Sequence, residues 1–140
     1  MIIRTKVQTK IYPDELNRKV HRAEHAVAVQ AERDSRPYIP AATGRLRSSG
    51  RVYGNAIVWD PPYARMLWYG NVKVDPKYRK AGFVYPNLGI VRSRAGVKKV
   101  LASPKRKFKF REGEAYWFYD AMRAKVGHWI TLAQGVIARE

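Results

Sequence analysis

The sequence contains no cysteine, which excludes disulfide scaffolds, thiolate metal sites and cysteine catalysis. It also lacks any apolar run approaching the roughly 18 residues of a membrane-spanning helix. The first ten residues, MIIRTKVQTK, do not contain the apolar core of a secretory signal peptide. We therefore expect a protein that has no membrane partner and stays in the cytoplasm in which it is made.

Acidic residues are scarce. The chain has 11 Asp and Glu against 28 Lys and Arg, which gives a net charge of +17 and a pI near 10.5. The imbalance is concentrated in residues 71–111, which hold 13 Lys and Arg and a single acid, Asp75. Such a charge indicates a polyanionic partner or surroundings.

The bulk composition predicts one domain, residues 1–140, because 140 residues suit a single core and 46% of them are hydrophobic. We predict an α+β fold, with a small, mostly antiparallel β-sheet and two long helices packed on one face of it. The basic stretch 71–111 carries three prolines and no helical period. It is therefore predicted to form a long extended insert or arm.

Helical spacing occurs in two stretches. Pro13 and the two acids after it are typical of a helix start, and a narrow apolar stripe continues to about Ala31 or Arg33. From Glu112 onward, apolar residues follow a three-four rhythm that predicts a second long helix. The aromatic stretch Tyr63–Tyr69 is compatible with a short helix or a third strand.

Strands are indicated by period-two alternation. Ile2–Ile11 alternates apolar and polar residues, and Leu46–Val58 reads as two short strands joined by a turn at Gly54-Asn55. Within the basic insert, Val97–Leu101 and Phe108–Phe110 could form further short strands.

One motif resembles a metal site. His21, Glu24 and His25 fit the pattern H-x-x-E-H, in which two histidines hold zinc and the glutamate acts as a base, so a zinc hydrolase is one alternative. On a helical wheel, however, both histidines point about 140° to 180° away from Leu16 of the apolar stripe. A catalytic zinc also needs a third protein ligand inside a cleft. We therefore interpret both histidines as surface residues.

Other catalytic patterns are missing from the sequence. Ser48 and Ser49 have no G-x-S-x-G surroundings, His128 lies in the predicted C-terminal helix beside Trp129, and no glycine-rich phosphate loop is present. We predict a protein that is not an enzyme, with no catalytic, cofactor-binding or metal-binding residues and no cofactor.

The basic insert interleaves its charges with the aromatic residues Tyr78, Phe83, Tyr85, Phe108 and Phe110. Aromatic and cationic side chains together can bind single-stranded nucleic acid by stacking and phosphate contact. The same pattern fits an arm that packs its aromatic residues on a neighbouring subunit. No recognised nucleic-acid module is present, so contact with DNA would be non-specific. The residues predicted to face a partner protein or DNA are Arg45, Arg47, Arg92, Arg94, Lys98, Lys99, Lys105, Arg106, Lys107 and Lys109.

Three short motifs occur in a fixed order along the chain. They are Thr43-Gly44-Arg45-Leu46-Arg47-Ser48-Ser49, then Pro62-Tyr63-Ala64-Arg65, then Trp117-Phe118-Tyr119-Asp120-Ala121. In this order they resemble the minor capsid proteins of tailed phages, a family similar to the neck and tail-completion proteins of siphophages. The resemblance spans roughly Asp14 to the C-terminus and leaves out the basic insert.

The resemblance implies a non-enzymatic structural component of the virion at the head–tail junction, a minor capsid, neck or tail-completion protein assembled in the bacterial cytoplasm. It implies other connector or tail proteins as partners, self-association as a ring around the DNA path, and possible non-specific contact with packaged DNA. The alternative is a non-specific nucleic-acid-binding protein of a mobile element.

The first motif also has a physical interpretation. Thr43 and Gly44 suit a tight turn, and Leu46 is predicted to anchor the following strand in the core. Arg45 and Arg47 would then alternate outward along that strand, where either could meet a carboxylate of a neighbouring protein or DNA.

Overall fold

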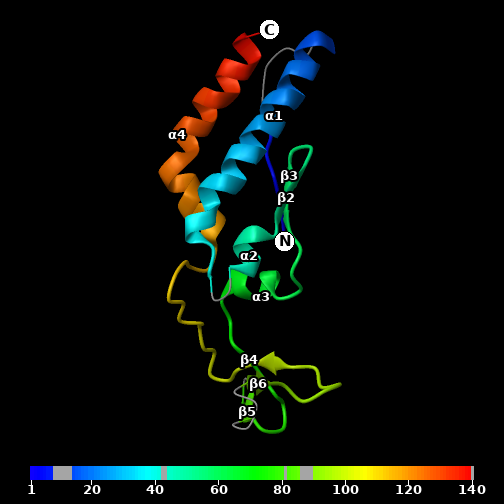
Figure 1. The fold of residues 1–140 in the computed structure, drawn as a ribbon, viewed down its shortest axis with the longest axis vertical. Helices are drawn as coiled ribbons and strands as arrows, with labels where there is room; N and C mark the ends of the chain where they lie inside the picture. The colour runs from blue at the N-terminus through cyan, green and yellow to red at the C-terminus, as the bar shows by residue number, and fades with distance from the viewer. Residues whose placement is uncertain (8–13, 42–43, 81, 86–89, 140) are drawn as a thin grey trace. The chain divides into compact units, whose positions relative to one another are not determined.

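The computed structural model describes residues 1–7, 14–41, 44–80, 82–85 and 90–139. The chain divides into two compact units (Figure 1). The first unit comprises Met1–Trp68 and Phe110–Glu140, and the second comprises Tyr69–Lys109. Two compact units in one chain are not by themselves independently folding domains, so the single domain stays a prediction.

The first unit contains a three-stranded antiparallel sheet in the order β1-β3-β2. Its strands are β1 (Ile2–Arg4), β2 (Gly50–Tyr53) and β3 (Ala56–Trp59). The predicted hairpin turn is confirmed, because Gly54 and Asn55 connect β2 and β3. Gly54 has a φ of +58°, which glycine adopts without steric cost.

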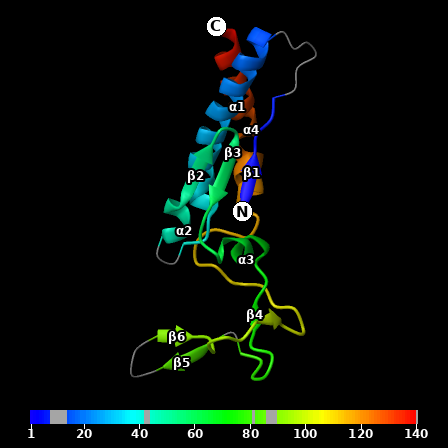
Figure 2. The ribbon, with the colours of Figure 1, turned by 90° about the vertical axis from the view of Figure 1, so that its right-hand side faces the viewer.

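Two long helices, α1 (Asp14–Ser35) and α4 (Trp117–Ala138), pack side by side in the first unit. Figure 2 shows both behind the three strands, so the predicted arrangement of two helices on one face of a small antiparallel sheet is confirmed. The buried alanines of the two helices have small side chains, which allow the helices to approach closely. They are Ala23, Ala28 and Ala31 on α1 and Ala121 and Ala133 on α4.

Three tryptophans form the centre of the first unit. Trp117, at the start of α4, is fully buried and meets the ring of Trp59 on β3 edge-on at 5.8 Å between centroids. It meets the ring of Trp68 in the same manner at 5.0 Å. Trp68 belongs to α3 (Ala64–Tyr69), so the helical alternative for this stretch is the right one. The tryptophan cluster therefore joins a strand and two helices.

The C-terminal helix begins at Trp117, five residues later than the prediction from Glu112. Gly113 and Tyr116 have φ values of +78° and +54°, which a right-handed helix cannot contain. Gly113 also passes so close to Ile39 that an added Cβ would lie 2.5 Å from its carbonyl carbon. The N–H of Glu114 donates to the carbonyl of Tyr38 at 2.9 Å. Residues 112–116 are therefore held against residues 38–40 before the helix can start.

The prediction of a strand starting at Leu46 is wrong. Arg45–Ser48 forms a short helix, α2, preceded by Gly44 with a φ of +79°, and the strand starts only at Gly50. Leu46 is buried as expected, but it is buried from a helix. The predicted first strand is also too long, because β1 ends at Arg4 and the later part of that prediction, from residue 8, lies outside the described residues.

The first long helix continues to Ser35, slightly beyond the predicted end near Arg33. The Ser35 hydroxyl donates to the carbonyl of Glu32 at 2.8 Å, which closes the last turn. A 3-10 turn, η1 (Arg36–Tyr38), follows directly and contains Pro37.

The second unit is built from pairs of short strands. β4 (Lys73–Val74) pairs with β7 (Val100–Leu101), and β5 (Phe83–Tyr85) pairs with β6 (Ile90–Arg92), both antiparallel. β7 falls inside the first of the two strands predicted for the insert. The second predicted strand, Phe108–Phe110, is not formed, although the neighbouring Lys107 makes an isolated bridge to Asn71.

Candidate partner interface

The only acid of the basic segment lies inside the second unit. The side chain of Asp75 directly after β4 is 3% exposed, and both of its oxygens accept hydrogen bonds from Arg94. The distances are 2.6 Å from Arg94 Nε and 3.0 Å from Arg94 Nη2. Such a two-point pair between guanidinium and carboxylate fixes both side chains in orientation.

Asp75 also organises the turn that follows it. Its Oδ1 accepts the backbone N–H groups of Lys77 at 2.8 Å and Tyr78 at 3.2 Å, and its backbone carbonyl accepts that of Arg79. The turn places Lys77, Arg79 and Lys80 at the surface. The Tyr78 ring lies below both Lys77 and Arg94, at 5.2 and 4.9 Å from the cationic groups. One buried carboxylate thus shapes a turn that displays three cations.

The Arg94 guanidinium holds the pKa of Asp75 well below its usual range, and the two backbone N–H groups lower it further. Partial desolvation acts in the opposite direction and is outweighed. Asp75 is therefore an anion at neutral pH, and its charge is balanced internally. Because this is the single acid of the segment, no carboxylate is left at the described surface of the second unit to offset the exposed cations.

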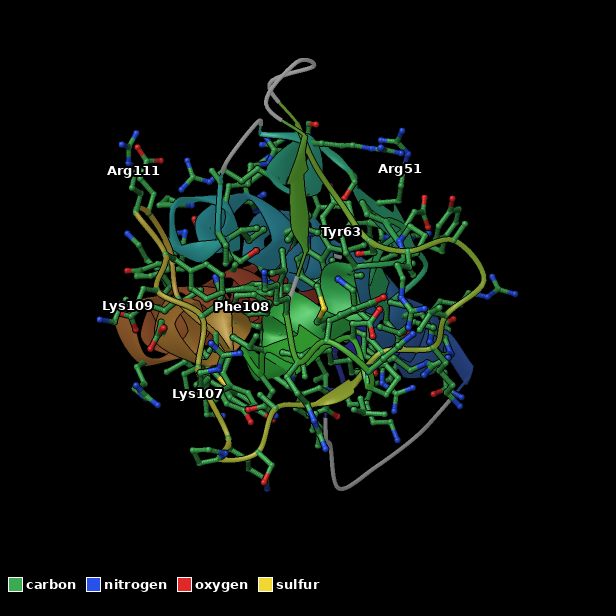
Figure 3. All side chains as sticks on the ribbon, turned by 90° about the horizontal axis from the view of Figure 1, so that it is seen from below. Arg51, Tyr63, Lys107, Phe108, Lys109 and Arg111 are labelled. Carbon is green, nitrogen blue, oxygen red and sulfur yellow. The ribbon has the colours of Figure 1, made fainter. Side chains whose placement is uncertain are left out.

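A second group of cations lies on the segment that pairs with residues 70–74. The N–H of Val72 donates to Arg106 O at 2.9 Å and the N–H of Phe108 donates to Gly70 O at 2.8 Å. These bonds fix the backbone on both sides of Lys107. Figure 3 labels Lys107 together with its chain neighbours Phe108 and Lys109. The exposed cations of this segment are Lys105, Arg106, Lys107 and Lys109.

Replacing Asp75 by Asn is expected to loosen the second unit and leave the first unchanged. Asn can still accept the turn N–H groups, but it cannot balance the Arg94 guanidinium. Backbone hydrogen exchange in residues 69–109 should accelerate, while α1 and α4 keep wild-type protection. Asp60→Asn, which neutralises an exposed carboxylate of the first unit, is the matched control. Wild-type exchange rates in Asp75→Asn would contradict this role for the ion pair.

The same ion pair predicts a pH dependence. A carboxylate whose pKa is lowered by folding stabilises the folded state at pH values above its unfolded pKa of about 3.9, and that stabilisation is lost as the pH falls below it. Protection factors in residues 69–109 should therefore fall on acidification below about pH 4 in the wild type. In Asp75→Asn this component should be absent.

The predicted partner-facing residues fall into two groups. Lys98, Lys105, Arg106, Lys107 and Lys109 are exposed on the second unit. Lys107 is partly engaged, because its Nζ donates to Tyr69 O at 3.3 Å. Partner contact by these five residues stays a prediction.

The remaining predicted residues differ in their surroundings. Lys99 is half-buried, Arg45 is exposed on α2, and Arg94 is committed to Asp75. Arg92 lies on β6, and its side chain is outside the described part of the structure.

Arg47 does not point outward from a strand as predicted. Its guanidinium donates to Ile39 O at 3.0 Å and Pro37 O at 3.2 Å, and it pairs with Glu112 at 3.2 Å. These contacts hold the turn after α1 and the segment before α4 together. The side chain is therefore a structural element of the first unit, a role that alternation along a supposed strand could not reveal.

The H-x-x-E-H motif lies on α1, and its members have partners within the first unit. Glu24 is buried and accepts the N–H of Val7 at 3.0 Å, while His25 Nδ1 lies 2.6 Å from Gly54 O. His21 is exposed and lies 3.6 Å from Glu24. The predicted surface position of both histidines is confirmed. The described residues include no group of three or more His, Cys, Asp or Glu that could hold a metal ion.

Comparison with known proteins gives one match. The sequence model of the family described as "Minor capsid protein" matches residues 3–89. The first two motifs, at residues 43–49 and 62–65, lie inside the matched range, and the motif at residues 117–121 lies beyond it. No curated protein and no solved structure matches the chain. Within the described ranges, no helix is long and apolar enough to cross a membrane.

Proposed function

This chain belongs to the phage minor capsid protein family, and we propose that within the virion it is a neck or tail-completion component at the head–tail junction. The family makes it a structural protein of the phage particle. The proposal adds its place and its assembly: a ring of copies around the DNA path, which joins other connector or tail proteins through the basic second unit. No chemical step is part of this role.

The observation that carries the proposal is the charge of the second unit. Residues 69–109 hold 12 Lys and Arg and one acid, and that acid is buried against Arg94. Two surfaces of the same charge repel each other, whereas contact between surfaces of opposite charge is electrostatically favourable. The second unit therefore suits contact with an acidic partner.

The charge of the first unit indicates which partner this is. The first unit carries the other 16 Lys and Arg against 10 Asp and Glu, so it is also basic overall. A closed ring needs two different surfaces on each copy, and the basic second unit finds no oppositely charged unit in a neighbouring copy. We therefore assign the second unit to contact with acidic patches of other junction proteins. Packaged DNA is the competing polyanion.

Deleting the gene from its phage tests the proposed place in the virion. Electron microscopy of the lysate should show full heads and separate, completed tails, and a plasmid copy of the gene should restore joined particles. Normal joined particles without the protein would contradict the proposal. Heads that are aberrant or contain no DNA would contradict it too, because they would place the protein in head assembly or packaging.

A further inference from the structure

An apolar groove runs along the first unit between helix α4 and residues 4–7, at the end of β1. Its volume is about 560 Å³, within the range of about 300 to 1,000 Å³ that is typical of ligand pockets. Phe118 and Trp129 are stacked at 5.6 Å and line it from α4, Val27 lines it from α1, and Arg4–Val7 lines its other side. Figure 2 shows the three elements α1, α4 and β1 that contribute.

The α4 side of this groove is an exposed apolar stripe. Met122, Val126 and Ile130 follow one another at intervals of four residues, so they lie on one face of the helix. Their exposed fractions are 36%, 41% and 55%. Three large apolar side chains in a row beside a groove indicate a contact surface, because isolated folded proteins rarely expose such a continuous patch.

The opposite side of the groove has an open strand edge. Among the residues that the structure describes, β1 is the end strand of the sheet and pairs with β3 alone. The N–H of Thr5 donates to Asn55 O and the carbonyl of Met1 accepts the N–H of Trp59. In an antiparallel ladder these groups alternate, so the backbone N–H and C=O of Ile2 and Arg4 point away from β3. An extended peptide can add to such an edge.

The charged residues in the described lining of the groove are all cationic. Arg4 and Lys6 line it, and no acidic residue is among the described residues of its lining. From the apolar stripe, the open edge and the two cations, we propose that this groove binds an extended segment of another virion protein. The segment adds as a strand to the edge of β1. Its apolar side chains alternate into the groove, and its acidic side chains lie against Arg4 and Lys6.

A second copy of this chain that presents its own groove is a poor occupant on charge grounds. A contact of the groove with itself would bring Arg4 and Lys6 of one copy against the same residues of another, and like charges facing each other cost binding energy. The proposal rests on membership of the virion and not on the place at the head–tail junction. Its test therefore does not depend on the outcome of the gene deletion.

Photo-crosslinking in assembled particles tests the proposal directly. A benzophenone amino acid is placed at Ile130 in the full chain, the variant complements the deletion phage, and crosslinked peptides from purified virions are identified by mass spectrometry. The matched control places the probe at His128, which is exposed on the same helix and does not line the groove. We expect the Ile130 probe to capture a segment of a different virion protein with alternating apolar and acidic residues. The His128 probe should not capture it.

Charge reversal gives a second, independent measurement. Arg4→Glu with Lys6→Glu should lower the Ile130 crosslink at least about tenfold, a loss of about 1.4 kcal/mol. Arg51→Glu with Arg65→Glu removes equal charge from β2 and α3, outside the groove, and should leave the yield unchanged. Capture of another copy of this chain, capture of a segment without acidic residues, or no capture at all would overturn the proposal. Equal yields in the two charge variants would also overturn it.

Discussion

Phage carrying Gln in place of Lys105, Arg106 and Lys109 are expected to accumulate full heads and finished tails that do not join, although the protein itself folds normally. All three side chains are exposed on the segment whose backbone is fixed by Val72 N–H to Arg106 O and Phe108 N–H to Gly70 O. Those backbone bonds survive the substitutions. The variant therefore removes charge and preserves the surface that carried it.

The expected effect is large because the three cations are neighbours and act on one contact. Electrostatic complementarity governs the rate of association and the choice of partner more than it governs fold. We expect the number of joined particles, counted by electron microscopy, to fall at least about tenfold. The circular dichroism spectrum and the melting temperature of the purified variant should match the wild type.

A control variant separates position from net charge. Arg18→Gln, Arg33→Gln and Arg65→Gln together remove the same charge from exposed positions of the first unit. This variant should join heads and tails at the wild-type level. Equal defects in the two variants would show that total charge matters, and the assignment of the second unit to a specific partner would then be wrong.

DNA is distinguished from a protein partner by salt. If the second unit binds phosphates, affinity for free duplex DNA should fall by about 10³ or more between roughly 50 and 200 mM salt for six or more contacts. The Lys105, Arg106 and Lys109 variant would then flatten that dependence. We expect free-DNA affinity to change little while joining fails, because a passage through which DNA must slide gains little from binding it strongly. A flattened salt dependence with normal joining would favour DNA.

The sequence predicted the elements whose causes are local. The alternation around Ile3, the turn at Gly54-Asn55 and the three-four spacing after Trp117 all depend on neighbours in the chain. The start of α4 could not be predicted in this way. Gly113 adopts its left-handed backbone because it passes beside Ile39, a contact across more than 70 residues of chain.

The candidate interface was predictable in composition but not in construction. The run of cations is visible in the sequence, and so is the lone acid. The pairing of Asp75 with Arg94, 19 residues later, depends on how the second unit folds. The same holds for Arg47, whose partners at Pro37, Ile39 and Glu112 meet only after the chain has turned back on itself. The groove beside β1 was missed, although the four-residue spacing of Met122, Val126 and Ile130 was a signal for it.

The largest expected effect on stability is that of Trp117→Ala. The side chain is fully buried and touches the rings of both Trp59 and Trp68. Replacing a buried tryptophan by alanine typically costs about 3 to 5 kcal/mol, because the transfer energy is lost and a cavity remains. A domain has only about 5 to 15 kcal/mol in total. Urea unfolding followed by helical circular dichroism should therefore show the free energy of unfolding of the first unit lowered by about 3 to 5 kcal/mol at 25 °C.

Replacement by phenylalanine separates the two roles of a tryptophan, its volume and its N–H group. Among the described residues, Trp117 Nε1 has no hydrogen-bond partner. Trp117→Phe therefore removes a buried donor that forms no hydrogen bond in the folded state. Trp129 Nε1 donates to the Asp34 carboxylate at 2.7 Å, so Trp129→Phe removes a charge-assisted bond between α4 and α1. Such a bond contributes about 1.5 to 3 kcal/mol. Although Trp117 is the more deeply buried, we expect Trp129→Phe to lower the free energy of unfolding more than Trp117→Phe. The reverse order would show that ring volume decides the stability of this core and that the bond to Asp34 contributes little.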